Sequence, residues 1–192
     1  TGGINLADEY INAVTRFGHW QDSSVMIKGD AVTQLSAMFL QTWYFANNTD
    51  EKEYSSYFCN KKYDYDGYVQ PFSDSPISGH LTGELAYMNM INNANHYVYI
   101  TTPYLILDNE MVTAIRLAVE SGIDVRIITP HIPDKWYVHA VSISNYPQLL
   151  KAGVKIFEYT PGFIHAKTIV VDDKLAIVGT TNFDFRSFYL HF

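Results

Sequence analysis

The stretch that decides the fold is Phe163-Ile164-His165-Ala166-Lys167-Thr168-Ile169-Val170-Val171-Asp172, closely followed by Gly179-Thr180-Thr181-Asn182. The run from Thr168 to Val171 is apolar and rich in β-branched residues, which predicts a strand. Because side chains alternate between the two faces of a strand, we expect His165 and Lys167 to point the same way. Two cationic groups side by side in a buried position repel each other, and burial disfavours the charge of both. A bound anion would relieve these costs. Phosphate is the natural candidate, since Lys neutralises charge while His serves as nucleophile or acid near neutral pH.

The length and charge of the chain narrow its class. Its 192 residues suffice for a full domain with a sizeable core. The net charge of −7 argues against a general electrostatic attraction to nucleic acid, so any phosphate site must be local. The single cysteine, Cys59, excludes an internal disulfide framework, and no apolar run approaches the ~20 residues of a membrane span.

From residue 81 onward, segments with helical spacing alternate with segments typical of strands. The predicted strands are Tyr97–Thr101, Val125–Thr129, Val154–Phe157 and Leu175–Val178, the last returning antiparallel to the strand that contains His165. One helix is predicted between Asp108, its cap, and Gly122. Another begins near Asp134 and is expected to be interrupted near Pro147. This alternation predicts an α/β fold, a mixed, mainly parallel sheet flanked by helices on both faces.

The region before residue 81 is less regular. A short strand is predicted at Ser23–Lys28, and an amphipathic helix is predicted to begin after Gly29-Asp30. Residues 47–67 are polar and lack periodicity, which indicates a long surface connection.

Two of the predicted strands end next to polar segments, Thr102-Pro103-Tyr104 and Thr129-Pro130-His131. Ligands of parallel sheets bind beyond the carboxyl ends of the strands. We therefore expect both segments to rim one cleft, and we predict that Tyr104 contacts the substrate.

The pattern His165-x-Lys167-x4-Asp172-x6-Gly179-Thr180-x-Asn182 resembles the HKD motif of the phospholipase D superfamily, with every fixed position at the expected spacing. A chance His-x-Lys pair on a strand is commoner than a catalytic one, but the trailing Gly-Thr-x-Asn argues against chance. Within the superfamily, the chain most resembles the C-terminal part of the bacterial cardiolipin synthase family. The segments that carry this resemblance are Thr1-Gly2-Gly3-Ile4-Asn5, Gly18-His19-Trp20-Gln21-Asp22, Val69-Gln70-Pro71, Thr102-Pro103-Tyr104-Leu105, Ala152-Gly153-Val154-Lys155-Ile156 and Asn182-Phe183-Asp184-Phe185-Arg186-Ser187.

The resemblance implies a domain organisation. Members of this family carry two HKD motifs, so residues 1–46 would be the tail of a first phospholipase D-like half and residues 47–80 a connecting segment. Residues 81–192 would form the second half, which carries the HKD motif found here. The first motif would then precede Thr1, and the chain would be a fragment that is inactive by itself.

The resemblance also assigns roles to the residues of the motif. In this family one histidine attacks phosphorus to form a phosphohistidine, and the histidine of the other motif protonates the leaving alcohol. We expect His165 to be the acid and the histidine before Thr1 to be the nucleophile. Lys167 and Asn182 would hold the non-bridging oxygens of the phosphate, and Gly179 would let the backbone come close. The residues expected to bind substrate are Asn5, Asp22, Tyr104, Gly179 and Thr180.

Two acidic residues need separate treatment. The motif groups Asp172 with the catalytic residues, but its strand parity is opposite to that of His165. We therefore expect Asp172 to face away and to satisfy the turn or neighbouring backbone. By the family pattern, Asn5 belongs to the first motif and Asp22 is the acid that orients the histidine of that motif, a solvated loop residue being the alternative. The matching acid for His165 would lie beyond Phe192.

The implied reaction is phosphatidyl transfer between two phosphatidylglycerol molecules, which yields cardiolipin and glycerol without a metal or cofactor. Two alternatives stay open: phosphodiester hydrolysis of lipid or nucleic acid, and a phosphate-binding or interaction module that could pair two copies into a homodimer. The expected partners are the phospholipid substrate and a membrane surface, the latter through parts outside this chain, with no nucleic acid. The full-length protein is expected at the bacterial cell membrane and this fragment is expected to be soluble.

Overall fold

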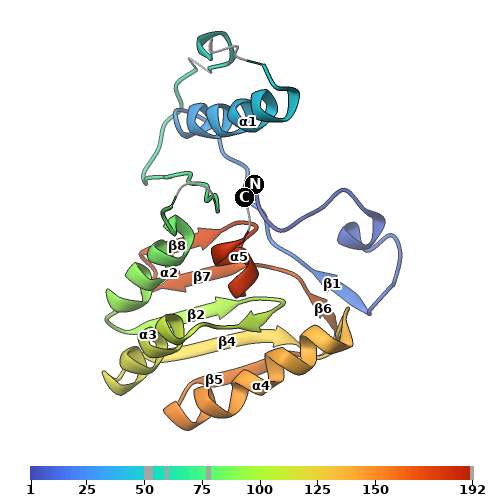
Figure 1. The fold of residues 1–192 in the computed structure, drawn as a ribbon, viewed down its shortest axis with the longest axis vertical. Helices are drawn as coiled ribbons and strands as arrows, with labels where there is room; N and C mark the ends of the chain where they lie inside the picture. Colours follow the sequence, from blue (N-terminus) through green and yellow to red (C-terminus); the bar gives the residue numbers. More distant parts are fainter. Residues whose placement is uncertain (50–53, 59–60, 77–78, 191–192) are drawn as a thin grey trace. The chain divides into compact units, whose positions relative to one another are not determined.

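The computed structural model describes residues 1–49, 54–58, 61–76 and 79–190, so Cys59 lies outside the described residues. The chain divides into two compact units (Figure 1). The larger unit comprises Thr1–Val25 and Asp74–Phe192, and the smaller unit is Met26–Ser73. The boundaries at residues 46 and 80 that the family resemblance implies remain a prediction.

A five-stranded sheet with the order β5-β4-β2-β7-β8 forms the centre of the larger unit. Its strands are β2 (Tyr97–Thr101), β4 (Asp124–Pro130), β5 (Lys155–Tyr159), β7 (Thr168–Val171) and β8 (Leu175–Val178). β4 pairs in parallel with both β2 and β5, whereas β7 pairs antiparallel with β2 and β8. Among the strands of this sheet, β7 alone therefore runs against the others. The predicted fold class, a mixed and mainly parallel α/β sheet, is confirmed.

Three helices of the larger unit pack side by side against one face of this sheet: α2 (Thr82–Asn92), α3 (Asn109–Glu120) and α4 (Trp136–Ala152) (Figure 1). The side chain of Asp108 caps α3 as predicted, accepting a 2.8 Å hydrogen bond from the backbone N–H of Met111. α4 continues through Pro147, although an interruption was expected there. Pro147 costs the carbonyl of Ile143 its helical donor, and because Ile143 is exposed, water can take that place.

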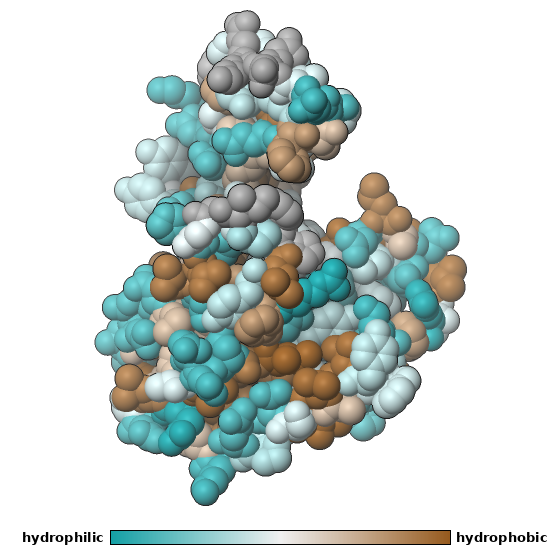
Figure 2. All heavy atoms as spheres, viewed as in Figure 1, coloured by the Kyte–Doolittle hydropathy of each residue, from teal (hydrophilic) through white to brown (hydrophobic). Residues whose placement is uncertain are grey.

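The two faces of the sheet differ in burial. Along β2 and β4 every second residue is buried, and these residues join the helices in one core: Val98, Ile100, Val125 and Ile127. The intervening residues, such as Tyr99 and Arg126, are only half-buried. The described helices that contact this sheet thus gather on one face, whereas the sequence predicted helices on both faces. Figure 2 shows hydrophobic side chains reaching the surface on that side of the larger unit.

Two small parallel sheets connect distant parts of the sequence. β1 (His19–Gln21) pairs with β6 (Gly162–Ile164), and β3 (Leu105–Ile106) pairs with β9 (Phe183–Asp184). The backbones of β1 and β6 lie so close that a Cβ on Gly162 would collide with the backbone of His19. The prediction of a short strand at Ser23–Lys28 is wrong. Within these residues the structure has a single isolated β-bridge, between Ser24 and Gly2.

Short helices complete the larger unit. The 3-10 helix η1 (Asp8–Ile11) precedes β1, and α5 (Phe185–Tyr189) follows β9. The hydroxyl of Tyr189 lies 2.8 Å from carboxylate oxygens of both Glu84, at the start of α2, and Asp108, at the start of α3. This shared hydroxyl ties α5 to the helical layer.

The smaller unit contains α1 (Ala31–Asn47), which begins after Gly29-Asp30 as predicted, and the 3-10 helix η2 (Ser55–Tyr57). Leu40 and Tyr44 are the residues of α1 that are buried. No described helix of either unit combines the length and apolar character needed to cross a bilayer.

Candidate active site

His165 lies where the chain passes from one sheet to another. β6 pairs with β1, whereas β7 pairs with β2 and β8, so residues 165–167 form the corner between the two pairings. The strand that the sequence predicts begins only at Thr168, and His165 and Lys167 precede it. The backbone N–H of His165 donates a 2.7 Å hydrogen bond to the carbonyl of Gln21, which fixes the corner to the end of β1.

The imidazole of His165 is paired with a carboxylate. Its Nδ1 lies 2.7 Å from Oδ2 of Asp22, and the two side chains are 15% and 2% exposed. The other oxygen of Asp22 accepts a 2.7 Å hydrogen bond from the backbone N–H of Ser23. Gly3 packs so closely that a Cβ there would collide with this second oxygen. The carboxylate is therefore held in one position, and it leaves Nε2 as the nitrogen of His165 that is available for chemistry.

This pairing corrects the assignment of Asp22 to a histidine outside the chain. In the register of β1 and β6, Gln21 lies opposite Ile164, so the residues that follow, Asp22 and His165, meet directly. The sequence separation of 143 residues hid this contact, because a three-residue strand leaves too weak a pattern to reveal its partner.

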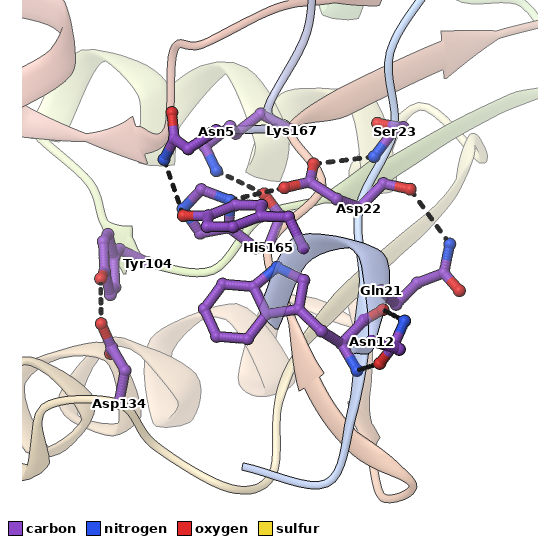
Figure 3. A network of polar contacts seen from close by, with 11 residues as sticks. Asn5, Asn12, Gln21, Asp22, Ser23, Tyr104, Asp134, His165 and Lys167 are labelled. Atoms are coloured by element: carbon purple, nitrogen blue, oxygen red, sulfur yellow. Dashed lines mark hydrogen bonds and ion pairs between the residues drawn. The ribbon is translucent and has the colours of Figure 1, made fainter. Parts of the chain in front are cut away.

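Aromatic rings enclose the imidazole. The ring centroids of Tyr10, Trp20 and Phe163 lie 5.3, 5.6 and 6.0 Å from that of His165. The buried indole N–H of Trp20 has no hydrogen-bond partner in the described part of the chain. Asn12 holds the backbone of Trp20 at both polar atoms, with distances of 2.7 and 3.0 Å (Figure 3).

Lys167 is the buried cation of the site, with 4% of its surface exposed. Its ammonium donates to the carbonyl oxygen of His165. Burial lowers the pKa of Lys167 to about 8, and the carboxylates of Asp22, Asp184 and Asp134 oppose this effect. The sequence predicted that burial would disfavour the charge of Lys167, as is found, whereas the carboxylate bound to His165 was not expected within this chain. The anion site itself remains a prediction.

Asn182 also lies in this unit, but its amide is engaged. Both its backbone N–H and its Nδ2 donate to Oγ of Ser187, at 3.1 and 3.2 Å. Its Oδ1 is buried without a partner among the described residues. The side chain of Asp184 accepts a 2.7 Å hydrogen bond from the N–H of Ser187 and so caps α5. The predicted contact of Asn182 with phosphate oxygens remains a prediction.

Asp172 occupies the opposite end of β7. Its carboxylate accepts hydrogen bonds from the backbone N–H groups of Asn95, His96 and Tyr97 at 2.7 to 2.9 Å. These donors, that of Tyr97 above all, lower the pKa of Asp172 to about 2. This placement agrees with the structural role expected from strand parity. It argues against the catalytic role suggested by the place of Asp172 in the motif.

The remaining predicted binding residues have different surroundings. Asn5 is exposed and donates a 2.7 Å hydrogen bond to the hydroxyl of Tyr10, whose ring packs on His165. Gly179 donates to the carbonyl of Lys167 at 3.3 Å, and the space that a Cβ would take there is open. Thr180 is exposed.

Tyr104 lies in the loop after β2, as predicted. Its hydroxyl donates a 2.6 Å hydrogen bond to Oδ2 of Asp134, which follows β4 (Figure 3). Burial raises the pKa of the Tyr104 phenol, and the bond to Asp134 adds to this effect. Asp134 was predicted only as the approximate start of a helix, and its position beside Tyr104 required the register of β2 and β4.

Several other residues around the site were not predicted as functional. Trp20 and Ser187 belong to segments that carried the family resemblance, so the sequence contained a signal for them. Tyr10 and Asn12 carried none. Within the described residues, no group of three or more His, Cys, Asp or Glu side chains is arranged to hold a metal ion.

Comparisons with known proteins identify the family of the chain. Residues 87–192 match the family model described as "Cardiolipin synthase, PLD-like domain". An uncharacterized protein of Streptococcus mutans is 50% identical over 193 residues, and a cardiolipin synthase of Halalkalibacterium halodurans is 41% identical over 195 residues. Both alignments cover 100% of this chain, but only 41% and 38% of those proteins, so the chain spans about two fifths of their length.

A solved structure shows the same fold over nearly the whole chain. The phosphatidylserine synthase of Haemophilus influenzae aligns with a TM-score of 0.65 and 14% sequence identity. The alignment covers 99% of this chain and 53% of that one. At this identity the likeness concerns the fold alone.

Proposed function

Because the chain belongs to the PLD-like domain family of cardiolipin synthase, we propose that it forms part of an enzyme that transfers a phosphatidyl group from one phosphatidylglycerol to another. The products are cardiolipin and glycerol. Cardiolipin synthases align with the whole of this chain over 38% of their own length, which supports this choice of reaction within the superfamily.

The observation that carries the proposal is the pair formed by Asp22 and His165 next to buried Lys167. The carboxylate accepts a hydrogen bond from Nδ1–H and stabilises positive charge on the ring, so Nε2 can give and take a proton without losing its position. Lys167 offsets the negative charge that gathers on the non-bridging oxygens in the transition state.

In the first step, a ring nitrogen of another histidine attacks the phosphorus of the donor lipid. The bond between this phosphorus and the oxygen of the headgroup glycerol breaks. His165 gives the proton on Nε2 to that oxygen, and glycerol leaves. The chain holds one His-x-Lys-x4-Asp pattern, so the attacking histidine belongs to another copy of the motif.

In the second step, a hydroxyl of the acceptor phosphatidylglycerol attacks the same phosphorus, and His165 takes its proton. The bond from phosphorus to the nucleophilic histidine breaks, which releases cardiolipin and restores both histidines. Water in place of the acceptor would give phosphatidic acid, so the exclusion of water separates transfer from hydrolysis.

Cardiolipin formation by the full-length protein in phosphatidylglycerol vesicles tests the proposal. His165→Ala should lower the rate by about 10²- to 10⁴-fold, the usual contribution of a positioned acid and base. His96→Ala is the matched control, because the side chain of His96 is exposed and its bond to Asp172 uses the backbone. Unchanged synthesis after His165→Ala, or phosphatidic acid as the sole product of the wild type, would contradict the proposal.

A further inference from the structure

One carboxylate of the site has no role in the mechanism above. The charges of Asp22, Asp184 and Asp134 all act on Lys167. Asp22 is bound to His165, and Asp184 accepts from Ser187 at the start of α5. Among the described residues, Asp134 is bound only through Oδ2, which accepts a 2.6 Å hydrogen bond from the hydroxyl of Tyr104.

The second oxygen of Asp134 is open to a ligand. In the described part of the chain no donor is hydrogen-bonded to Oδ1, and this oxygen is not sealed from solvent. A free carboxylate oxygen is unfavourable beside a site for an anionic phosphodiester, because like charges repel. A ligand that brings a hydrogen-bond donor to Oδ1 would remove this conflict.

Tyr104 presents a second acceptor next to the first. Its single hydroxyl proton is used on Asp134, so the phenolic oxygen can only accept from a ligand. Together Asp134 and Tyr104 therefore offer two acceptor oxygens on one side of the site, which suits a group with two neighbouring donors.

The charge nearby favours hydroxyl donors over ammonium donors. Nζ of Lys135, the residue after Asp134, lies 5.8 Å from the ring centre of Tyr104, and Lys167 supplies a second cation. The positive charges of Lys135 and Lys167 offset the negative charges of Asp134 and Asp184, while Asp22 is paired with His165. A headgroup with its own positive charge therefore gains no net attraction here and still loses its hydration. An uncharged diol would bind the two acceptors without that cost.

We propose that Asp134 and Tyr104 form a headgroup subsite that binds the hydroxyls of an uncharged polyol such as glycerol. This inference rests on the proposed function and specifies which part of the chain selects the headgroup. The bond between Asp134 and Tyr104 holds both oxygens in place before the ligand arrives, and the loops after β2 and β4 position them.

Calorimetric binding of soluble headgroup phosphates to the full-length protein tests the subsite without requiring turnover. The ligands are glycerol 1-phosphate, ethanolamine phosphate and inorganic phosphate. The wild type should bind glycerol 1-phosphate about tenfold more tightly than ethanolamine phosphate, as expected for hydrogen bonds to a charged acceptor.

Asp134→Asn and Tyr104→Phe should each remove most of this preference, because each changes one acceptor group and keeps the size of the side chain. The ratio to inorganic phosphate in the same variant shows whether the anion site survives. Asp124→Asn is the matched control, since Asp124 pairs with Arg126 and Lys155 away from the site, and it should keep the preference.

The possible results separate the subsite from the proposed function. A wild type without preference for the polyol, a preference for ethanolamine phosphate, or equal losses for all three ligands in both variants would overturn the subsite. A wild type that prefers glycerol 1-phosphate but makes no cardiolipin would support the subsite and contradict the proposed function. A wild type that makes cardiolipin but shows no preference would do the reverse.

Discussion

The two ends of β7 carry residues of one sequence motif in opposite environments. At one end, Lys167 is buried and burial lowers its pKa to about 8. At the other end, Asp172 is surrounded by backbone N–H groups that lower its pKa to about 2. Burial destabilises the charged form of Lys167, whereas hydrogen bonds stabilise the charged form of Asp172.

This difference shows how a structural residue can share a motif with catalytic ones. The three backbone donors to Asp172 come from residues 95–97, where the chain enters β2. They fix β7 against its neighbour and leave the carboxylate no free role toward a ligand. Lys167 donates to the carbonyl of His165, which carries no net charge. The positive charge of its ammonium therefore stays available to bind an anion.

The strongest way to sharpen this comparison is to remove charge from the site end. Asp22→Asn keeps the shape of the side chain but removes the negative charge that supports positive charge on His165. We expect kcat for cardiolipin formation by the full-length protein to fall by about 10²- to 10⁴-fold, as when the acid of a catalytic triad is neutralised. Steady-state kinetics at saturating lipid measure it. Asp172→Asn should change kcat by less than about tenfold, and equal losses in the two variants would break the comparison.

The second test uses the pKa of Lys167. Because burial disfavours its ammonium, the positive charge is lost as pH rises through about 8. Binding of inorganic phosphate should therefore weaken by up to about tenfold per pH unit above that value, one proton being lost from the site. Calorimetry between pH 6.5 and 9.5, limits chosen at about 1.5 units on either side, measures it.

The variant Lys167→Met is the control for this pH dependence. It should bind phosphate weakly at every pH and lose the change near pH 8. The same pKa shift also predicts how the stability of the folded chain changes with pH. Between pH 8 and the ordinary lysine value of 10.5, the unfolded chain binds a proton that the folded chain does not, so Lys167 makes the wild type more stable as pH rises. A phosphate affinity of the wild type that stays constant over the pH range of the calorimetry would contradict the assignment of this pKa to Lys167.

Local sequence patterns were sufficient to predict most of the central sheet. Tyr97–Thr101 and Leu175–Val178 are strands with the predicted bounds, because short apolar runs with β-branched residues between polar segments leave few alternatives. Asp108 was predicted as a cap from the helical pattern that follows it. These features depend on neighbours within a few residues.

The rest of the site depends on contacts that no local pattern contains. Asp22 reaches His165 only through the parallel pairing of β1 and β6, and the loop-like sequence Gly18-His19-Trp20-Gln21-Asp22 gives little sign of a strand. The same holds for Tyr10, whose ring meets the imidazole because η1 precedes β1. The structural role expected for Asp172 agrees with its backbone contacts, although the parity argument assumed one continuous strand and His165 in fact precedes β7.

The smallest expected effect concerns the structural end of β7. Asp172→Ala removes the acceptor of three backbone N–H groups, so these donors must find water or stay unpaired. We expect a lower Tm, with kcat per folded molecule changed by less than about tenfold, because the site lies at the other end of the strand. Thermal unfolding followed by circular dichroism measures the stability, and activity is assayed well below Tm.

The stabilisation that Asp172 gives to the folded chain should depend on pH. Since the folded-state pKa of Asp172 lies near 2, below the ordinary 3.8, the carboxylate stabilises the folded chain at any pH above 3.8 and loses that contribution as pH falls through about 2. The difference in Tm between wild type and Asp172→Ala should therefore be constant near neutral pH and shrink in acid. Asp66→Ala, at an exposed position in the smaller unit, is the control and should show no such difference. A loss of activity without a loss of stability in Asp172→Ala would return this residue to the catalytic group, and the two ends of β7 would no longer differ in role.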